Sequence, residues 1–205
     1  MGDLETGGNK MKGNPFFVFS KPYLDFIGKG RIFSFVYIIM AVINLIIPFV
    51  IIYITIDSGA FGFGAKFIFA AVSSWLVIMF ANWIGFQIWW NRRAKIAEVT
   101  SYEFVATICF SEILQTFGEW LGTLLGIIGA GVGLIAFIFF GNDASNLFRL
   151  IGLDFMRGPM IIVIGPVAGF FIIILFRFLA EQLRLFASLV NNTKDIASNN
   201  KSKGY

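Results

Sequence analysis

Four long apolar stretches constrain the fold of this 205-residue chain more than any other feature. They cover residues 32–56, 67–90, 121–140 and 160–176, and the last one continues slightly further. An α-helix needs about 20 mainly apolar residues to cross the hydrocarbon core of a bilayer. The composition agrees, because 14% of the residues are charged, against about 25% in an ordinary soluble domain. The sequence therefore predicts an all-α integral membrane protein with four transmembrane helices.

The basic residues indicate how these helices are oriented. Four spans place both termini on one side, and thirteen of the sixteen Lys and Arg residues fall on that side. Only Lys66, Arg149 and Arg157 fall on the other side. Because loops that stay in the cytoplasm carry such an excess, we expect both termini to be cytoplasmic. We attribute the net charge of +4 to this asymmetry and expect no nucleic-acid partner.

The cytoplasmic side is expected to hold amphipathic helices and an aromatic belt. Residues 20–28 form a short predicted helix capped by Ser20, and residues 100–120 an amphipathic one that begins with a capping box at Thr100 and Glu103. Four tryptophans lie toward the same side, as an interfacial belt would. They are Trp83, Trp89, Trp90 and Trp120.

The stretch "FRFLAEQLRLFASLV", residues 176–190, begins in the fourth apolar run and leads into a polar tail. Its polar residues recur at helical steps of four and three, starting with Arg177, Glu181 and Arg184. We expect the fourth helix to continue beyond the membrane boundary for two to four turns. The alternative is a frayed interfacial end with a snorkelling Arg177.

The two halves of the chain share a plan, in which an amphipathic helix precedes a hairpin of two spans. Residues 17–27 align with residues 104–114, and residues 67–96 with residues 161–190. Two spans per unit preserve orientation, so the pattern suits two tandem parallel repeats. The predicted divisions are a disordered N-terminal tail (1–14), the first helix and hairpin (15–96), the second helix and hairpin with a cytoplasmic helix extension (97–197), and a C-terminal tail (198–205).

Glycines recur along one face of the third apolar stretch and again in the fourth. Small residues at such spacing let transmembrane helices approach closely. The stripe predicts either packing between the third and fourth spans of one chain or a groove for a partner helix or a lipid tail. Its members are Gly118, Gly122, Gly126, Gly129 and Gly133, followed by Gly165 and Gly169.

Charged residues lie near the inner boundary of the same two spans. Glu119 is expected at the opening of the third helix, where the helix dipole favours an acid, and Arg177 and Glu181 close the fourth. A charge costs less near the interface than at the bilayer centre. We predict a structural ion pair between Glu119 and Arg177, with Glu181 beside it, that fixes how the two helices cross.

Two segments, "FSEILQTFGEWLGTLLGIIGAGVGLIAFIF" and "FRFLAEQLRLFASLVNNTKDI", are similar to small bacterial polytopic membrane proteins that are uncharacterised and of unknown function. Those proteins also end a span in an aromatic amphipathic helix that carries Arg and Glu. The resemblance covers the second half of the chain. It implies a bacterial inner-membrane setting and no particular activity.

The residue types needed for catalysis are scarce. The chain has no His and a single Cys, so we assign no catalytic, cofactor-binding or metal-binding residue. We expect a non-enzymatic accessory or scaffold subunit of an inner-membrane complex, with the bilayer and other membrane subunits or further copies as partners. The alternatives are a small homo-oligomeric transporter or channel that uses Asn44, Asn82 and Gln87, and an anionic-lipid-binding protein of the membrane surface.

Overall fold

The computed structural model describes residues 31–98, 105–141 and 160–202, and the regular elements in these ranges are helices. All four α-helices are long and apolar enough to cross a membrane. The prediction of an all-α chain with four such helices is confirmed. In chain order the elements are α2 (Arg31–Asp57), the short 3₁₀-helix η2 (Ala60–Phe63), α3 (Ala65–Glu98), α4 (Val105–Phe140) and α6 (Met160–Ser202).

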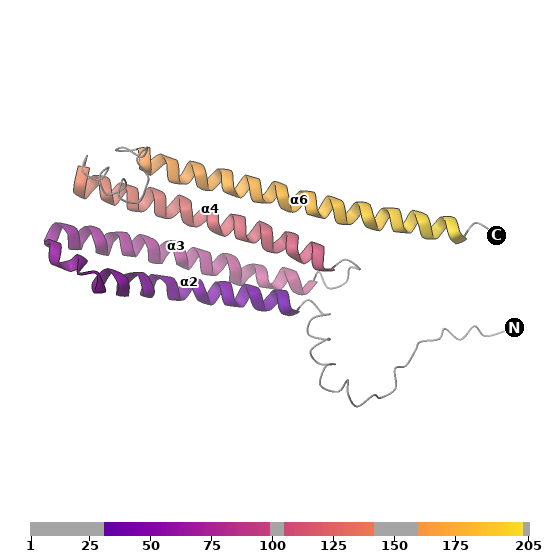
Figure 1. The fold of residues 1–205 in the computed structure, drawn as a ribbon, viewed down its shortest axis with the longest axis horizontal. Helices are drawn as coiled ribbons and strands as arrows, with labels where there is room; N and C mark the ends of the chain where they lie inside the picture. Colours follow the sequence, from indigo (N-terminus) through magenta and orange to yellow (C-terminus); the bar gives the residue numbers. More distant parts are fainter. Residues whose placement is uncertain (1–30, 99–104, 142–159, 203–205) are drawn as a thin grey trace, which may run out of the picture.

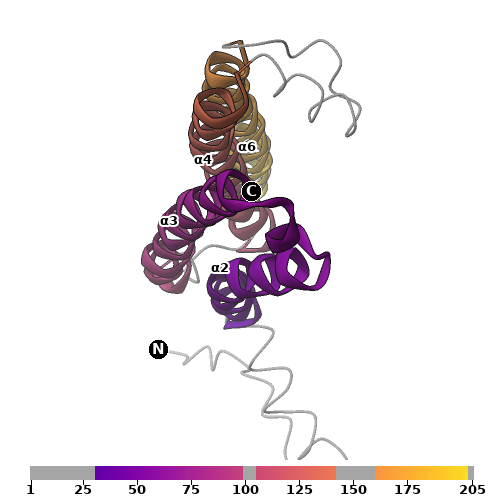
Figure 2. The same ribbon diagram turned by 90° about the vertical axis from the view of Figure 1, so that its left-hand side faces the viewer.

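The four long helices lie side by side in the order in which they occur in the chain (Figure 1). Seen from the end, α4 and α6 stack above the pair formed by α2 and α3 (Figure 2). Each helix packs mainly against its neighbours in the sequence, and α2 and α6 form opposite edges of the array.

Glycine allows the tight turn between α2 and α3. Gly59 and Gly64 have φ angles of 69° and 98°, on either side of η2. Residues with a Cβ atom rarely adopt this region of the backbone map. The N–H of Gly59 donates to the carbonyl of Ile56 at 3.0 Å, and the N–H of Gly62 donates to the carbonyl of Gly59 at 2.9 Å. These bonds reverse the chain so that α2 and α3 run antiparallel.

Large apolar side chains cover the outside of all four helices, and small residues occupy much of the inside. Phe49, Phe69 and Phe170 are among the exposed residues, whereas Ala41, Ala81 and Ala180 are buried. Lipid tails are as apolar as leucine, so helices in a bilayer associate through close packing and polar contacts rather than by hiding large apolar groups. The distribution is the one expected for helices that face lipid.

α4 differs from its prediction because it is one continuous helix from Val105 to Phe140. The sequence predicts an amphipathic segment that ends near residue 120 and a separate span from residue 121. Glu119 therefore lies in the middle of a helix, and the predicted position at a helix N-terminus is wrong. The only helix-weakening residue at this junction is Gly118, which costs about 1 kcal/mol relative to alanine and does not break a helix supported by packing.

The stretch at residues 176–190 belongs to α6, which runs from Met160 to Ser202 without interruption. The prediction that the fourth helix continues is confirmed. Its extension is longer than expected, because Ser202 lies roughly seven turns beyond residue 176. The first part of the predicted C-terminal tail is consequently helical.

Other predictions concern residues outside the described ranges. They include the helix capped by Ser20, the capping box of Thr100 and Glu103, the N-terminal tail and the outer basic residues Arg149 and Arg157. Residues 17–27, on which part of the proposed duplication rests, are also outside these ranges. These statements stay predictions.

Candidate functional site

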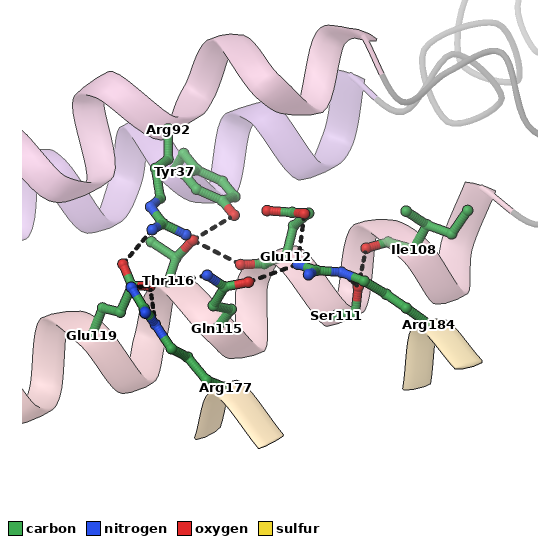
Figure 3. A network of polar contacts seen from close by, with 10 residues as sticks. All are labelled: Tyr37, Arg92, Ile108, Ser111, Glu112, Gln115, Thr116, Glu119, Arg177 and Arg184. Carbon is green, nitrogen blue, oxygen red and sulfur yellow. Dashed lines mark hydrogen bonds and ion pairs between the residues drawn. The ribbon is translucent and has the colours of Figure 1, made fainter. Parts of the chain in front are cut away.

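The N-terminal half of α4 carries a polar face on an otherwise apolar helix. Steps of three and four residues place its polar side chains on adjoining lines of one face. Arginines from α3 and α6 reach toward this face from either side (Figure 3). We call the group the polar cluster, and it consists of Tyr37, Arg92, Ser111, Glu112, Gln115, Thr116, Glu119, Arg177 and Arg184.

Glu119 joins three helices through its carboxylate. Arg92 of α3 forms an ion pair with its Oε2 atom, and Arg177 of α6 donates to Oε1 from Nε at 3.0 Å and from Nη2 at 2.9 Å. Gln115, one turn earlier on α4, donates to the same Oε1 atom at 2.9 Å. The Glu119 side chain is only 13% exposed, so both arginines neutralise a largely buried charge.

A second anchor lies two turns away, where Arg184 of α6 contacts three residues of α4. Its Nη2 atom lies 2.7 Å from both Glu112 Oε1 and Gln115 Oε1. Its Nε atom donates to Ser111 Oγ at 3.2 Å. Gln115 thus donates toward Glu119 and accepts from Arg184, which links the two anchors into one chain of polar contacts (Figure 3).

α2 reaches α4 at two points along their length. The hydroxyl groups of Tyr37 and Thr116 lie 3.1 Å apart, and the ring of Tyr37 meets Trp89 edge-on at a centroid distance of 5.1 Å. Further along, Trp120 Nε1 donates to Asn44 Oδ1 at 2.7 Å. Tyr37 and Asn44 are fully buried, so these neutral contacts replace hydrogen bonds that water would otherwise make.

The glycine stripe of α4 lies against α6. A Cβ atom added to Gly129 would lie 2.7 Å from the Cα atom of Gly165, and one added to Gly169 would lie 3.1 Å from the backbone N of Gly126. Cβ atoms at Gly118 and Gly122 would overlap Phe176 and the Gly169 backbone. Of the two predicted uses, the stripe serves packing within one chain, and Gly133 is buried as well.

The structure brings together two of the three residues of the predicted ion-pair group. Glu119 and Arg177 are in contact, whereas Glu181 is exposed and forms no ion pair with the described residues. The sequence patterns did not predict the role of Arg92 or the pair of Glu112 with Arg184. Gln115 lies four residues before Glu119 and three after Glu112, and this spacing was the available signal that both acids share one face.

The structure separates the four tryptophans of the predicted aromatic belt by their burial. Trp83 and Trp90 are exposed, but Trp89 is buried and Trp120 packs against the hydrophobic core. An interfacial tryptophan and a core tryptophan have the same position along a helix and differ only in direction. The belt prediction is therefore wrong for Trp89 and Trp120.

The polar residues that a pore would use do not converge. Asn44 is bonded to Trp120 and to the Met40 carbonyl, Asn82 is buried on α3, and Gln87 faces outward. In the part of the chain that the structure describes, no group of three or more acidic, Cys or His side chains is placed to hold a metal ion. The arrangement of the polar cluster is that of a clamp between helices.

Comparisons of the chain with protein-family models, with curated proteins and with solved structures give no match. The function proposed below therefore rests on the geometry of the polar cluster.

Proposed function

We propose that this protein is a non-enzymatic scaffold or accessory subunit of an assembly in the bacterial inner membrane. The polar cluster carries the proposal, because both of its carboxylates are bound to arginines from neighbouring helices. Groups committed in this way hold helices in place and do not offer a free acid or base. A reaction would need such a free group beside a substrate site.

The lengths of the helices support a transmembrane placement with the polar cluster near one boundary. From Glu119 to the end of α4 at Phe140 is roughly 32 Å of helix, and from the start of α6 to Arg177 roughly 26 Å. The hydrocarbon core of a bilayer is about 30 Å thick. If the far ends of α4 and α6 reach one boundary, the ion pairs lie close to the other.

The distribution of charge supports a cytoplasmic location for the end that bears the polar cluster. That end carries Arg92, Arg93 and Lys95 on α3, together with the basic residues of α6, whereas Lys66 lies at the opposite end of α3. The positive-inside rule then puts both termini in the cytoplasm.

The far part of α6 supports a role in assembly. α6 extends past the beginning of α4 (Figure 1), and apolar side chains on this part remain uncovered. Ile196, beyond the beginning of α4, is 63% exposed, and Phe186 and Leu189, beside the first turns of α4, are 63% and 64% exposed. A helix that leaves the bilayer with such a surface needs either headgroups or another subunit to cover it.

Gentle extraction from the native membrane, followed by measurement of mass and composition, tests the proposal. We expect a fixed ratio with unlike membrane proteins. A photoreactive residue at Leu189 should crosslink to one of them, while the same residue at Phe171, equally exposed on the lipid-facing half of α6, should label lipid. A closed homo-oligomer would favour the transporter alternative, and a monomer with no crosslinked protein would contradict a scaffold role.

A further inference from the structure

A groove of about 370 Å³ opens between α2 and α3 on the outer surface of the helix array. Leu45, Pro48 and Phe49 line it from α2, and Leu76, Met79 and Trp83 line it from α3. Binding pockets for small ligands have volumes of about 300–1,000 Å³ and are mainly apolar. The groove is large enough for a ligand and is distinct from the polar cluster.

The one side-chain amide that lines the groove already has its partners. It belongs to Asn44, and Asn44 Nδ2 donates to the Met40 carbonyl at 2.7 Å. Asn44 Oδ1 accepts from Trp120 Nε1, on the side away from the groove. An occupant of the groove must therefore be apolar along its length.

A column of stacked side chains leads from the groove to the end of α3. Trp83 stacks on Phe86 at a centroid distance of 5.4 Å, and Phe86 stacks on Trp90 at 5.5 Å. The guanidinium of Arg93 lies over the ring of Trp90, 4.1 Å from its centroid. From Trp83 to Arg93 is roughly 15 Å of helix, which equals the depth of one leaflet of a hydrocarbon core about 30 Å thick.

The column ends at a positive charge that the described residues do not neutralise. Within the described ranges, Arg93 and Lys95 form no ion pair, whereas the adjacent Arg92 is bound to Glu119. The contact of Arg93 with Trp90 uses the face of the guanidinium and leaves N–H donors at its edge for an anion. The aromatic column thus joins the apolar groove to one cation, Arg93, at the level where headgroups lie.

We propose that this face of α2 and α3 binds one anionic phospholipid of the cytoplasmic leaflet. An acyl chain follows the aromatic column and its end enters the groove near the middle of the bilayer, while the phosphate lies at Arg93. The cation favours a lipid with net negative charge over a zwitterionic one. This inference rests on the membrane orientation given under the proposed function.

The full chain in nanodiscs with equal parts phosphatidylglycerol and phosphatidylcholine provides the test, and native mass spectrometry counts the lipids that stay bound. The wild type should retain phosphatidylglycerol preferentially. R93Q should lower its retention about fivefold, whereas K95Q should have a smaller effect, because residue 95 points about 200° away from residue 93 around the helix. M79W and L45W fill the groove from different helices, and both should lose the bound lipid. Two variants are used because one of them alone could lose the lipid by folding poorly. K66Q removes a cation at the other end of α3 and should change nothing.

Other outcomes would overturn the inference. Equal retention of the two lipids, or retention that R93Q leaves unchanged, would remove the headgroup site. Unchanged lipid retention in both groove variants would remove the acyl-chain site. Retention of soluble glycerol phosphate to the same extent as the lipid would do so too. A protein that alkaline carbonate washes off membranes would instead refute the membrane placement in the proposed function, so the two failures are distinguishable.

Discussion

α4 and α6 are held together in two different ways along a single interface. Toward their outer ends, glycines bring the two backbones into direct contact, as at Gly129 and Gly165. Toward the other end, arginines of α6 reach across to acids of α4, as in the pair of Arg184 with Glu112. We call these two regions the glycine seam and the polar cluster.

The two regions suit the environments that the proposed membrane placement gives them. At the bilayer centre an unpaired charge is costly, so shape and close approach are what remain to join helices. Near the boundary, arginines retain partial access to water, and Arg177 is 55% exposed. We therefore expect that added side-chain volume lowers the stability of the glycine seam, and that removal of a charge lowers the stability of the polar cluster.

The largest expected effect is that of Glu119→Gln. The substitution leaves Arg92 and Arg177 without their shared carboxylate, and breaking a buried ion pair on one side costs about 3–5 kcal/mol. We expect a loss of about 3 kcal/mol in the free energy of unfolding, measured in mixed micelles. Glu181→Gln removes the same charge from an exposed position and should stay within about 0.5 kcal/mol. Equal effects would show that the polar cluster does not hold the helices.

Gly129→Ala should have the next largest effect. Its Cβ atom would lie 2.7 Å from Gly165 Cα, and backbone cannot move aside as a side chain can. Overpacking of this kind costs about 1–3 kcal/mol.

Gly126→Ala is the matched control from the same stripe. Its Cβ atom would have its nearest contact at 3.6 Å, an ordinary packing distance, so unfolding in mixed micelles should change little. If both alanine variants were equally stable, the seam would not depend on close approach.

Most features that sequence predicts correctly depend on one helix at a time, and the contact between Glu119 and Arg177, which joins two helices, is the exception. The four apolar helices follow from length and composition, and the glycine stripe follows from its spacing. The continuation of α6 follows from the periodicity of its polar residues.

The features that sequence misses depend on which helix lies opposite. Arg92 belongs to a basic run after the second span, and nothing in that run distinguishes it from Arg93. One lies on Glu119 and the other on Trp90, because neighbouring residues of a helix point about 100° apart. The direction of each residue relative to α4 is a property of packing, which the sequence pattern alone does not contain.

Trp120→Phe tests whether a neutral hydrogen bond at membrane depth is as important as an ion pair. The change removes the donor to Asn44 Oδ1 and leaves that buried atom unpaired. Interhelical hydrogen bonds in membranes average about 0.6 kcal/mol and reach about 1.7 kcal/mol. We expect a loss in this range. A double-mutant cycle with Asn44→Leu isolates the pair, and a coupling energy near zero would contradict its role.

The smallest expected effect within the polar cluster is that of Arg177→Gln. Compared with Arg92→Gln, it shows how much each of the two arginines that bind Glu119 contributes to stability. Arg177 is 55% exposed, whereas Arg92 is 21% exposed, although both bind the same carboxylate. Exposed ion pairs contribute about 0.2–1 kcal/mol and are screened by salt. We therefore expect a loss below about 1 kcal/mol for Arg177→Gln that shrinks as salt is raised. Arg92→Gln should cost more and depend less on salt, because its side chain lies between α3 and α4. The reverse order would mean that α6 rather than α3 holds the carboxylate, and the clamp would then belong to the α4–α6 pair alone.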